Sequence, residues 1–193
     1  MPRGGPLPAS IILPELLTPI AARNSKLRVR TRIGGAHQLM TALAADELDF
    51  AIVPRIQIDP SHNVSIEPVG WLNLIALVRP GHPLAGQAIT EETLRDWPVI
   101  GVSSLDDADV SGHARVEATI TCDSQEVLRR ITLNSEAVWL TADCLAQRDL
   151  VQLHGLQQED QIQIIAASPA GRTLSPAALT LIAASSAALA SGI

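Results

Sequence analysis

Apolar and polar positions at the start of the chain predict a helix followed by a strand. From Ser10, the segment IILPELLTPIAAR has apolar residues at helical spacing, with Ser10 as the expected cap and Pro14 in the first turn, where its missing N–H is not needed. The next segment, KLRVRTRI at 26–33, alternates apolar residues with arginines, which is the period of a strand with one solvated face. Gly34 and Gly35 end this expected strand.

A helix and a short strand follow the two glycines. Residues 36–48 (AHQLMTALAADEL) have helical spacing, and residues 49–54 (DFAIVP) form an apolar run that Pro54 ends. The order strand, glycine turn, helix, strand within so short a stretch predicts one βαβ unit. Its two strands are expected to run parallel, with a right-handed crossover.

The rest of the chain repeats this alternation. We expect a helix at 89–97 capped by Thr90, and a last helix that opens at Ser175 with Pro176 in its first turn. The other expected elements are strands at 64–70, 72–78, 98–102, 116–122, 137–141, 150–153 and 162–168, and helices at 124–133 and 142–148. This succession of strands and helices is typical of an α/β fold.

The apolar strand within LIALVRPGHPLAG (74–86) is expected to end in a turn. Pro80 and Pro83 remove two backbone donors, and Gly81 between them allows a positive φ. A ladder of strand hydrogen bonds therefore cannot continue through this segment.

The composition is that of a globular chain that does not itself bind nucleic acid. Hydrophobic residues make up 47% of the 193 positions, but there are only three Trp, one Phe and no Tyr, so platforms for stacking bases are not expected. Fourteen Lys and Arg against twenty Asp and Glu give a net charge of −6. That is the wrong sign for a surface that must follow phosphates.

Neither the cysteines nor the ends of the chain predict a metal site, a disulfide or a membrane anchor. Cys122 and Cys144 have no CxxC spacing and no paired histidine, so we expect buried, reduced thiols. The first ten residues lack the basic start and apolar core of a secretory signal, and no apolar run has the length of a membrane span. We therefore expect a cytoplasmic protein.

Several segments occur in the order and spacing of a known family. ELDFAIVP at 47–54, LIALVRPGHPLAG at 74–86 and LSPAALTLI at 174–182 resemble the effector-binding domain of LysR-type transcriptional regulators. The stretches 11–30 and 121–153 resemble the same domain in the order of their elements. The resemblance extends from about Pro6 to Leu189, which is nearly the whole chain.

The resemblance implies a two-lobed α/β fold like that of type II periplasmic binding proteins, each lobe being a mostly parallel sheet flanked by helices. Lobe I is expected at residues 1–71 and 164–193, and lobe II at 72–163. The two crossovers, near 72–76 and 161–165, would act as hinges, and a small molecule would bind between the lobes.

Two departures from the family are visible in the sequence. Nothing in it matches the helix-turn-helix domain and linker helix with which full-length members begin, and the family's usual opening strand, which would precede Gly4, is nearly absent. We therefore expect either a piece of a longer regulator or a stand-alone effector domain, with DNA contacted only through a missing N-terminal domain.

The resemblance implies ligand contacts from loops at strand ends and from helix N-termini, where free N–H groups favour anions. Ser10 is equally a helix cap, the two glycines are equally a simple turn, and Arg55 is either a bidentate contact to a carboxylate or a solvated arginine. The family often has hydroxyl residues where this chain has Leu7 and Pro8, which weakens carboxylate binding there. The candidates in lobe I are Pro8, Ser10, Gly34, Gly35, Pro54 and Arg55.

Lobe II offers hydroxyl side chains at corresponding positions. Ser103 and Ser104 follow the buried strand PVIGV and are the preferred ligand contacts, whereas Ser124 opens a helix and is better explained as its cap. Thr141, after AVWL, is a weaker candidate from the same lobe.

The sequence gives little support to catalysis, a metal or a cofactor. There is no GxSxG, and no histidine lies in a recognisable acid–base motif. The cluster Asp106, Asp107 and Asp109 lacks the glycine and terminal glutamate of an EF-hand and is expected to be a solvated loop. Cys122 as a redox sensor is disfavoured, because peroxide-sensing relatives use a closer cysteine pair elsewhere in lobe II.

We therefore expect the sensing and oligomerising domain of a LysR-type regulator, which binds a small, anionic metabolite between its lobes and forms a homodimer or a higher oligomer. A solute-binding protein of a transport system is the alternative from another class, and the absent secretory signal argues against it. An enzyme on the same two-lobed fold, such as a deaminase or dehydratase, would need an acid–base pair that the sequence does not offer.

Overall fold

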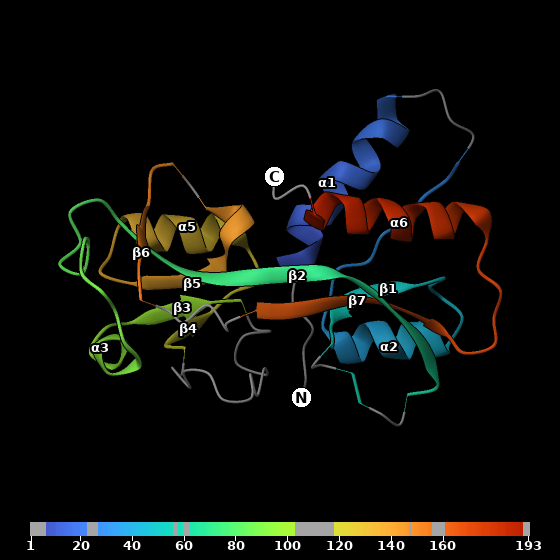
Figure 1. The fold of residues 1–193 in the computed structure, drawn as a ribbon, viewed down its shortest axis with the longest axis horizontal. Coiled ribbons are helices and arrows are strands. Elements are labelled where there is room, and N and C mark those ends of the chain that lie inside the picture. The colour runs from blue at the N-terminus through green and yellow to red at the C-terminus, as the bar shows by residue number, and fades with distance from the viewer. Residues whose placement is uncertain are drawn as a thin grey trace. The chain divides into compact units, whose positions relative to one another are not determined.

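The structure, a computed structural model, describes residues 7–22, 27–55, 58–59, 62–102, 118–146, 148–155 and 161–190. The chain divides into two compact units: unit 1 is Met1–Trp71 with Gln163–Ile193, and unit 2 is Leu72–Ile162. Two strands, β2 (Val64–Val78) and β7 (Gln161–Pro169), carry the chain from one unit to the other (Figure 1).

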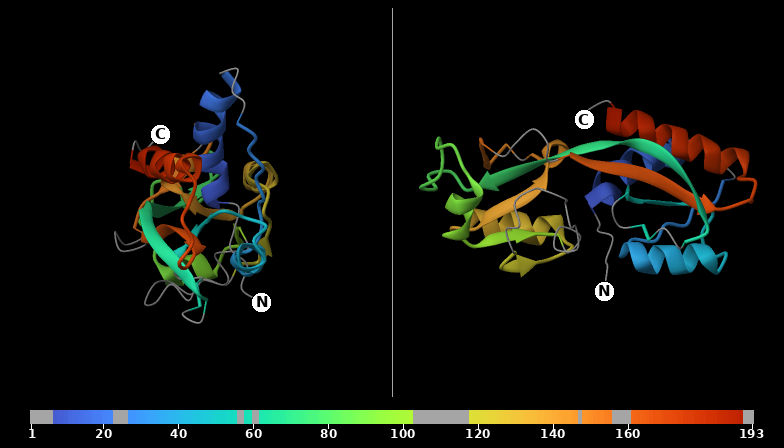
Figure 2. Two further views of the ribbon diagram at one scale, coloured as in Figure 1. Left: turned by 90° about the vertical axis from the view of Figure 1, so that its right-hand side faces the viewer. Right: turned by 60° about the horizontal axis from the view of Figure 1, so that its bottom comes forward.

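In unit 1, helices cover both sides of a small sheet. β1 (Ala51–Pro54) pairs antiparallel with β7, with Ala51 opposite Ala167. α2 (Ala36–Ala44) packs on one side through Leu39, Met40 and Leu43, and α6 (Pro176–Ala190) lies on the other (Figures 1 and 2). α6 begins as predicted, because the Ser175 hydroxyl accepts the Ala178 N–H at 3.1 Å. No helix in the described part of the chain is long and apolar enough to cross a bilayer.

α1 (Leu7–Ala22) packs against α6 but begins earlier than the sequence predicts. Ser10 therefore lies within the helix rather than at its cap, and Pro14 and Pro19 both lie in its interior. A proline there lacks an N–H and costs about 3 kcal/mol. Burial offsets that cost, at about 1.5–3 kcal/mol for each large apolar side chain, and the large apolar side chains buried on this helix are Ile11, Ile12 and Leu16.

The strand predicted at 26–33 does not form within its described residues, 27–33. Residues 27–35 run as an extended trace into α2 (Figure 1), and residues 28–34 make no backbone hydrogen bond to any described residue. The expected βαβ unit is thus incomplete: α2 and β1 form, but β1 pairs with β7 instead of with this segment. The alternating pattern was correct for an extended backbone, but a strand also needs a neighbour, which a local pattern cannot supply.

The second half of β2 forms part of a five-stranded sheet in unit 2. It pairs antiparallel with β5 (Val138–Ala142) on one edge and with β6 (Val151–Leu153) on the other. β3 (Val99–Gly101) pairs parallel with β5 and with β4 (Ile120–Thr121). α3 (Glu91–Arg95) and α5 (Gln125–Leu133) form as predicted, whereas the helix expected at 142–148 is only the 3₁₀ turn η2 (Asp143–Leu145).

The α/β fold class is confirmed, but the sheets are less parallel than expected. β3, β4 and β5 are parallel to one another, whereas β2 and β7 are antiparallel to strands with known register. The expected strands at 64–70 and 72–78 are also one continuous strand, β2. Both differences arise because β2 and β7 each take part in both units. β2 runs as one strand from unit 1 into unit 2, and β7 runs back from unit 2 into unit 1.

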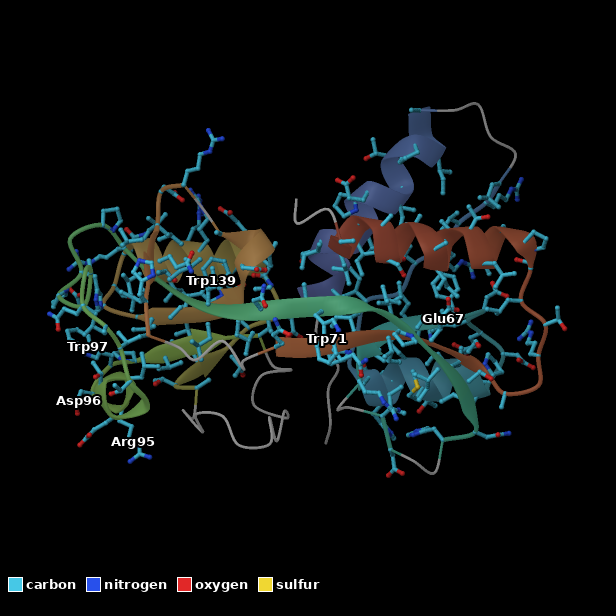
Figure 3. All side chains as sticks on the ribbon, in the orientation of Figure 1. Glu67, Trp71, Arg95, Asp96, Trp97 and Trp139 are labelled. Carbon is cyan, nitrogen blue, oxygen red and sulfur yellow. The ribbon has the colours of Figure 1, made fainter. Side chains whose placement is uncertain are left out.

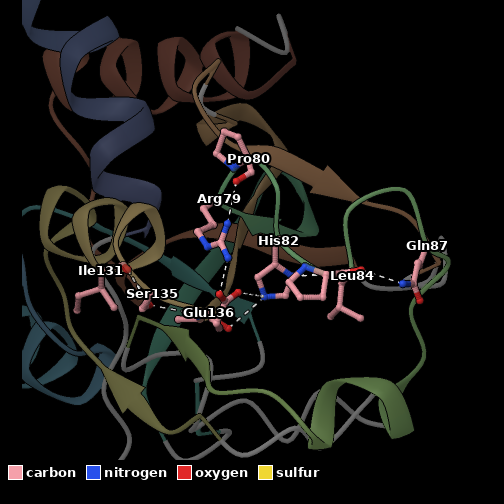
Figure 4. Close-up of polar contacts among 10 residues, drawn as sticks. Arg79, Pro80, His82, Leu84, Gln87, Ile131, Ser135 and Glu136 are labelled. Carbon is pink, nitrogen blue, oxygen red and sulfur yellow. Dashed lines mark hydrogen bonds and ion pairs between the residues drawn. The ribbon is translucent and has the colours of Figure 1, made fainter.

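The expected turn after β2 is confirmed. Gly81 has φ +73°, and the His82 N–H donates to the Arg79 carbonyl at 3.2 Å. His82 is buried at this turn: its Nδ1 accepts the Leu84 N–H at 3.1 Å, and its Nε2 lies 3.2 Å from the Glu136 carbonyl (Figure 4). Arg79 also forms an ion pair with Glu136. The turn is therefore attached to the segment that leads into β5.

Candidate functional site

The carboxyl ends of three parallel strands meet at one edge of unit 2. Ile100 of β3 lies opposite Ile120 of β4 on one side and Trp139 of β5 on the other. α5 begins just after β4, so its N-terminus lies at the same edge. Open α/β sheets bind ligands outside the carboxyl ends of their strands. This edge of unit 2, which we call the strand-end site, is therefore the candidate for ligand binding.

Three side chains of β5 and α5 contain buried polar atoms with no hydrogen-bond partner in the described part of the chain. They are Gln125 (Nε2 and Oε1), Trp139 (Nε1) and Thr141 (Oγ1). Trp139 and Thr141 are each only 1% exposed and, two residues apart on β5, lie on the same face of the sheet. α5 packs against β5. A buried polar group without a partner costs about 1–3 kcal/mol.

These atoms are mostly hydrogen-bond donors. The Trp139 indole nitrogen can only donate, and the Gln125 amide and Thr141 hydroxyl each offer an N–H or O–H. The first N–H groups of the nine-residue helix α5 add further donors and the positive end of its dipole. Glu126 in the first turn has its carboxylate 3.2 Å from Arg130. The donor set suits a ligand rich in acceptors, such as a carboxylate or another oxyanion.

Ser124 is the N-cap of α5. Its hydroxyl accepts the Val127 N–H at 3.4 Å, as expected for a cap. Ligand contact by Ser124 stays a prediction, as it does for Thr141. Ser103 and Ser104, the preferred contacts of this lobe, lie outside the described residues.

The candidates of unit 1 are spread over several elements. Gly35 is the N-cap of α2, and its N–H already donates to the Gln38 side chain at 3.3 Å. Pro54 is buried at the end of β1, and Arg55 directly follows it, exposed and without an ion pair to a described residue. Ser10 lies within the first turn of α1 and is exposed. Their roles in ligand binding stay predictions.

Pro8 and Gly34 line a pocket of about 440 Å³ within unit 1. The pocket is bounded by α1, the start of α6, residues 27–34 and residues 47–52. Of the ten residues that the sequence singled out, these are the two that the pocket brings together.

The acidic cluster and the side chain of one cysteine fall outside the described part of the chain. Asp106, Asp107 and Asp109 lie outside the described residues, as does the side chain of Cys144. Cys122 is a free thiol and is half-buried, so the expectation of full burial was wrong for it. Across the described ranges, no three His, Cys, Asp or Glu side chains are grouped so that they could hold a metal.

Sequence reasoning missed a polar network on the two connecting strands. The Asn73 amide of β2 donates to the Asp143 carboxylate at 2.6 Å, and the Gln161 amide of β7 donates to the Asn73 oxygen at 2.9 Å. All three residues belong to unit 2, next to the points where β2 and β7 leave it. Sequence separations of 70 and 88 residues left no local signal for these contacts.

The match to a family model decides the family. The model of the LysR substrate binding domain matches residues 5–190. The chain belongs to this family. The LysR substrate-binding domain is the effector-sensing part of transcriptional regulators, and the resemblance found in the sequence is thereby confirmed.

Solved structures of LysR-family proteins have the same fold. The regulatory domain of an OxyR2 variant from Vibrio vulnificus, described as sulfate-bound, is 19% identical with a TM-score of 0.77, and the match covers 95% of this chain and 92% of that one. HinK from Pseudomonas aeruginosa is 18% identical with a TM-score of 0.72, over 95% of this chain and 67% of its own. These values establish the periplasmic-binding-protein-like fold.

The LysR-family chain corresponds to only part of the longer structures. It is 16% identical to oxidized OxyR from Corynebacterium glutamicum with a TM-score of 0.71, and the match covers 97% of this chain but 64% of that one. A search among curated proteins finds no sequence that matches the chain.

Proposed function

We propose that this LysR-family chain senses a small anionic metabolite for a transcriptional regulator and takes part in the regulator's oligomerisation. The observation that carries the ligand part of the proposal is that Gln125, Trp139 and Thr141, on α5 and β5, hold buried donors without a hydrogen-bond partner among the described residues. A bound carboxylate or oxyanion would accept hydrogen bonds from them and remove most of the cost of their burial.

An anion is favoured over a neutral or cationic ligand by the chemistry of the site. The atoms without a partner among the described residues include an indole N–H, which has no acceptor function, and Gln125 is the first residue of α5. The OxyR2 regulatory domain that shares this fold is described as sulfate-bound, which supports an oxyanion as one class to test.

We propose that units 1 and 2 are the two lobes of the effector domain and that β2 and β7 are the strands through which they are coupled. A ligand can shift such a protein only if it binds one arrangement more tightly than another, because equal affinity shifts nothing. Asn73 lies on β2 and Gln161 on β7. A change in the geometry of either strand would therefore alter the hydrogen bonds that join Gln161 to Asn73 and Asn73 to Asp143.

DNA binding and oligomerisation belong to this proposal as properties of the whole regulator. A net charge of −6 argues that this chain does not make the phosphate contacts itself. A homodimer or higher oligomer is the expected assembly, with DNA contacted by a helix-turn-helix domain outside this sequence. Sedimentation of the purified chain tests the oligomer: a monomer at tens of micromolar would contradict that part.

A thermal-shift screen tests the ligand. The panel consists of small carboxylates, sugar acids, amino acids, sulfate and phosphate, and a ligand at 100 times its Kd should add about 2.7 kcal/mol, or about 5–10 °C in Tm. Thr141→Val removes the unpartnered hydroxyl at nearly constant volume. We expect it to abolish most of the ligand-induced shift while leaving the unliganded Tm equal or higher, because an unsatisfied buried group is lost.

Thr132→Val is the matched control. Thr132 is also fully buried in unit 2, but its hydroxyl already donates to the Leu128 carbonyl at 2.9 Å. This variant should have a lower unliganded Tm and an unchanged ligand-induced shift. Arg55→Ala and Ser103→Ala test the two further sequence-based contacts in the same assay. An anion whose shift survives Thr141→Val, or a panel without any hit, would contradict the proposed site.

A further inference from the structure

Cys122 lies at the carboxyl end of β4, in the strand-end site. Ile120 of β4 lies opposite Ile100 of β3, and the Cys122 N–H donates to the Gly101 carbonyl at 3.0 Å, so the pairing extends to the cysteine. Cys122 is therefore the neighbour of Val102, two residues beyond Ile100. The thiol is free and half-buried, and a small molecule bound at the strand ends would meet its sulfur.

The neighbour of Val102 on its other side is Thr141 of β5. Ile100 lies opposite Trp139, and two further residues along both strands bring Val102 opposite Thr141. Cys122, Val102 and Thr141 therefore form one row across three strands, and residues in one row of a sheet share a face. Two strand spacings, about 10 Å, separate the cysteine from the threonine, so both border the space that one small metabolite occupies.

This row lies on the face of the sheet that holds the buried donors. Val99 and Val138 pack in the core cluster that contains Leu94 of α3, and side chains alternate between the two faces of a strand. Trp139, which Figure 3 labels in unit 2, and Thr141 therefore lie on the face away from α3. Both are 1% exposed, and their indole N–H and hydroxyl have no partner among the described residues. The thiol thus shares its row with a polar group that indicates a ligand independently of the cysteine.

The residues that follow Cys122 supply further hydrogen-bond donors. Ser124 caps α5, while the backbone N–H groups of Gln125 and Glu126 make no hydrogen bond to a described residue. The Gln125 side-chain amide is buried and has no partner in the described part of the chain either. The Glu126 carboxylate lies 3.2 Å from Arg130, which balances its charge. These donors at the start of a nine-residue helix suit a carboxylate next to the sulfur.

We propose that Cys122 is a modification site for small carboxylates that carry an electrophilic carbon. The first N–H groups of α5 and the Gln125 amide hold the carboxylate, and the electrophilic carbon then lies within reach of the sulfur. This inference rests on the proposed function, because it uses the strand-end site as an anion site. It adds that this site binds one class of anion covalently.

The reaction is an addition or a substitution at carbon, not an oxidation. The thiol gives its proton to solvent, and the sulfur forms a bond to carbon. With an α,β-unsaturated acid the sulfur bonds to the β carbon, the electron pair of the double bond moves to the α carbon and takes up a proton, and no group leaves. With iodoacetate the carbon–iodine bond breaks and iodide leaves with the electron pair. In both products the carboxylate stays attached to the sulfur and occupies the strand-end site.

Alkylation by iodoacetate and by iodoacetamide tests this proposal. Both reagents react at an iodomethyl carbon, but only the first carries a carboxylate. Mass spectrometry of the peptide that contains Cys122 gives its rate with each reagent and separates it from Cys144. The iodoacetate rate is divided by the iodoacetamide rate, and the same ratio for the chain unfolded in urea is the reference. We expect the ratio to be at least about tenfold higher in the folded chain, because the site concentrates the anion beside the sulfur.

A charge substitution provides a second arm. Gln125→Glu keeps the size of the side chain and places a carboxylate where the donor was, so the iodoacetate rate should fall about tenfold and the iodoacetamide rate should stay the same. Gln152→Glu is the matched control, because Gln152 is exposed on β6, at the opposite edge of the unit 2 sheet from β4. Both variants add one negative charge, but only the first should lower the ratio. Circular dichroism checks that both stay folded.

An anion that binds in the thermal-shift screen separates this inference from the proposed function. At ten times its Kd, it should slow alkylation of Cys122 by both reagents about tenfold, because an occupied site excludes them. A bound anion that leaves both rates unchanged would overturn this inference and leave the proposed effector in place. A raised ratio with no hit in the panel would contradict the proposed effector and support Cys122 as an anion-guided site.

Three results of the alkylation arms would also overturn the inference. The first is a ratio that is the same in the folded and the unfolded chain. The second is a ratio that Gln125→Glu leaves unchanged or that Gln152→Glu lowers equally. The third is a folded chain in which neither reagent modifies Cys122.

Discussion

At the scale of single residues, His82 shows a side chain whose role is structural. Its Nδ1 accepts the Leu84 N–H at 3.1 Å, so Nε2 carries the hydrogen that donates to the Glu136 carbonyl at 3.2 Å. The ring centroid lies 4.6 Å from that of Trp97. The sequence placed His82 correctly in a turn, but it could not show that the ring is buried or that residue 136 is its partner.

We predict that His82→Ala lowers the free energy of unfolding by about 2–4 kcal/mol, because it leaves a cavity beside Trp97 and an unpaired Leu84 N–H. His82→Asn is the control, since its side-chain oxygen can still accept from Leu84 and should recover part of the loss. Urea denaturation measures both. Equal destabilisation by the two substitutions would show that ring packing alone matters.

At the scale of elements, the sequence predicted the helices and strands whose apolar spacing and cap or turn residues lie within a few neighbouring positions. α2, α5, α6, β3 and β5 formed where apolar spacing and a cap or turn residue coincided, as at Ser124 and Ser175. The strand prediction for 26–33 was wrong because alternation of apolar and polar residues says nothing about a neighbouring strand. α1 begins earlier than predicted because its packing against α6 is a tertiary contact. Caps are readable from a sequence because donor and acceptor lie three residues apart.

The two possible roles of Ser124, helix capping and ligand contact, predict different effects of its substitution on stability and on the ligand-induced thermal shift. Ser124→Ala should lower stability by about 1 kcal/mol through loss of the bond from the Val127 N–H, and should leave the ligand-induced thermal shift in place. Ser124→Asp, which keeps a capping acceptor, should restore the stability. Denaturation curves measured with and without the anion found in the screen distinguish these two roles. A shift that disappears in Ser124→Ala at unchanged stability would mean that the hydroxyl contacts the ligand instead.

At the scale of the whole molecule, β2 and β7 connect the units, and a small network of side-chain hydrogen bonds links these two strands. Asn73 on β2 receives a hydrogen bond from Gln161 on β7 and donates one to Asp143 at the end of β5. One amide therefore joins both connecting strands to the sheet of unit 2. Its position could follow only from the pairing of β2 with β5, in which Leu74 lies opposite Ala142.

Replacing Asn73 tests this role. Asn73→Ala removes both hydrogen bonds, and we predict faster backbone amide exchange at residues 72–74 and 161–163, where the strands leave unit 2. Asn134→Ala is the control, because the Asn134 side chain donates to the Arg130 carbonyl of its own helix. Hydrogen exchange followed by mass spectrometry measures both variants. Protection in β7 that is unchanged by Asn73→Ala would contradict the coupling of the two strands.

The sequence by itself determined the family, the α/β class and the elements whose caps, turns and apolar spacing lie within a few residues of each other. The tertiary structure decided which edges are paired, which polar atoms are buried without partners, and which distant residues meet. Thr141 is an ordinary strand residue in the sequence, and it is a candidate ligand donor only because the fold buries its hydroxyl without a partner among the described residues. Residues 28–33 have a strand pattern but make no backbone hydrogen bond to a described residue, because hydrogen bonds between strands depend on a partner that no local pattern encodes.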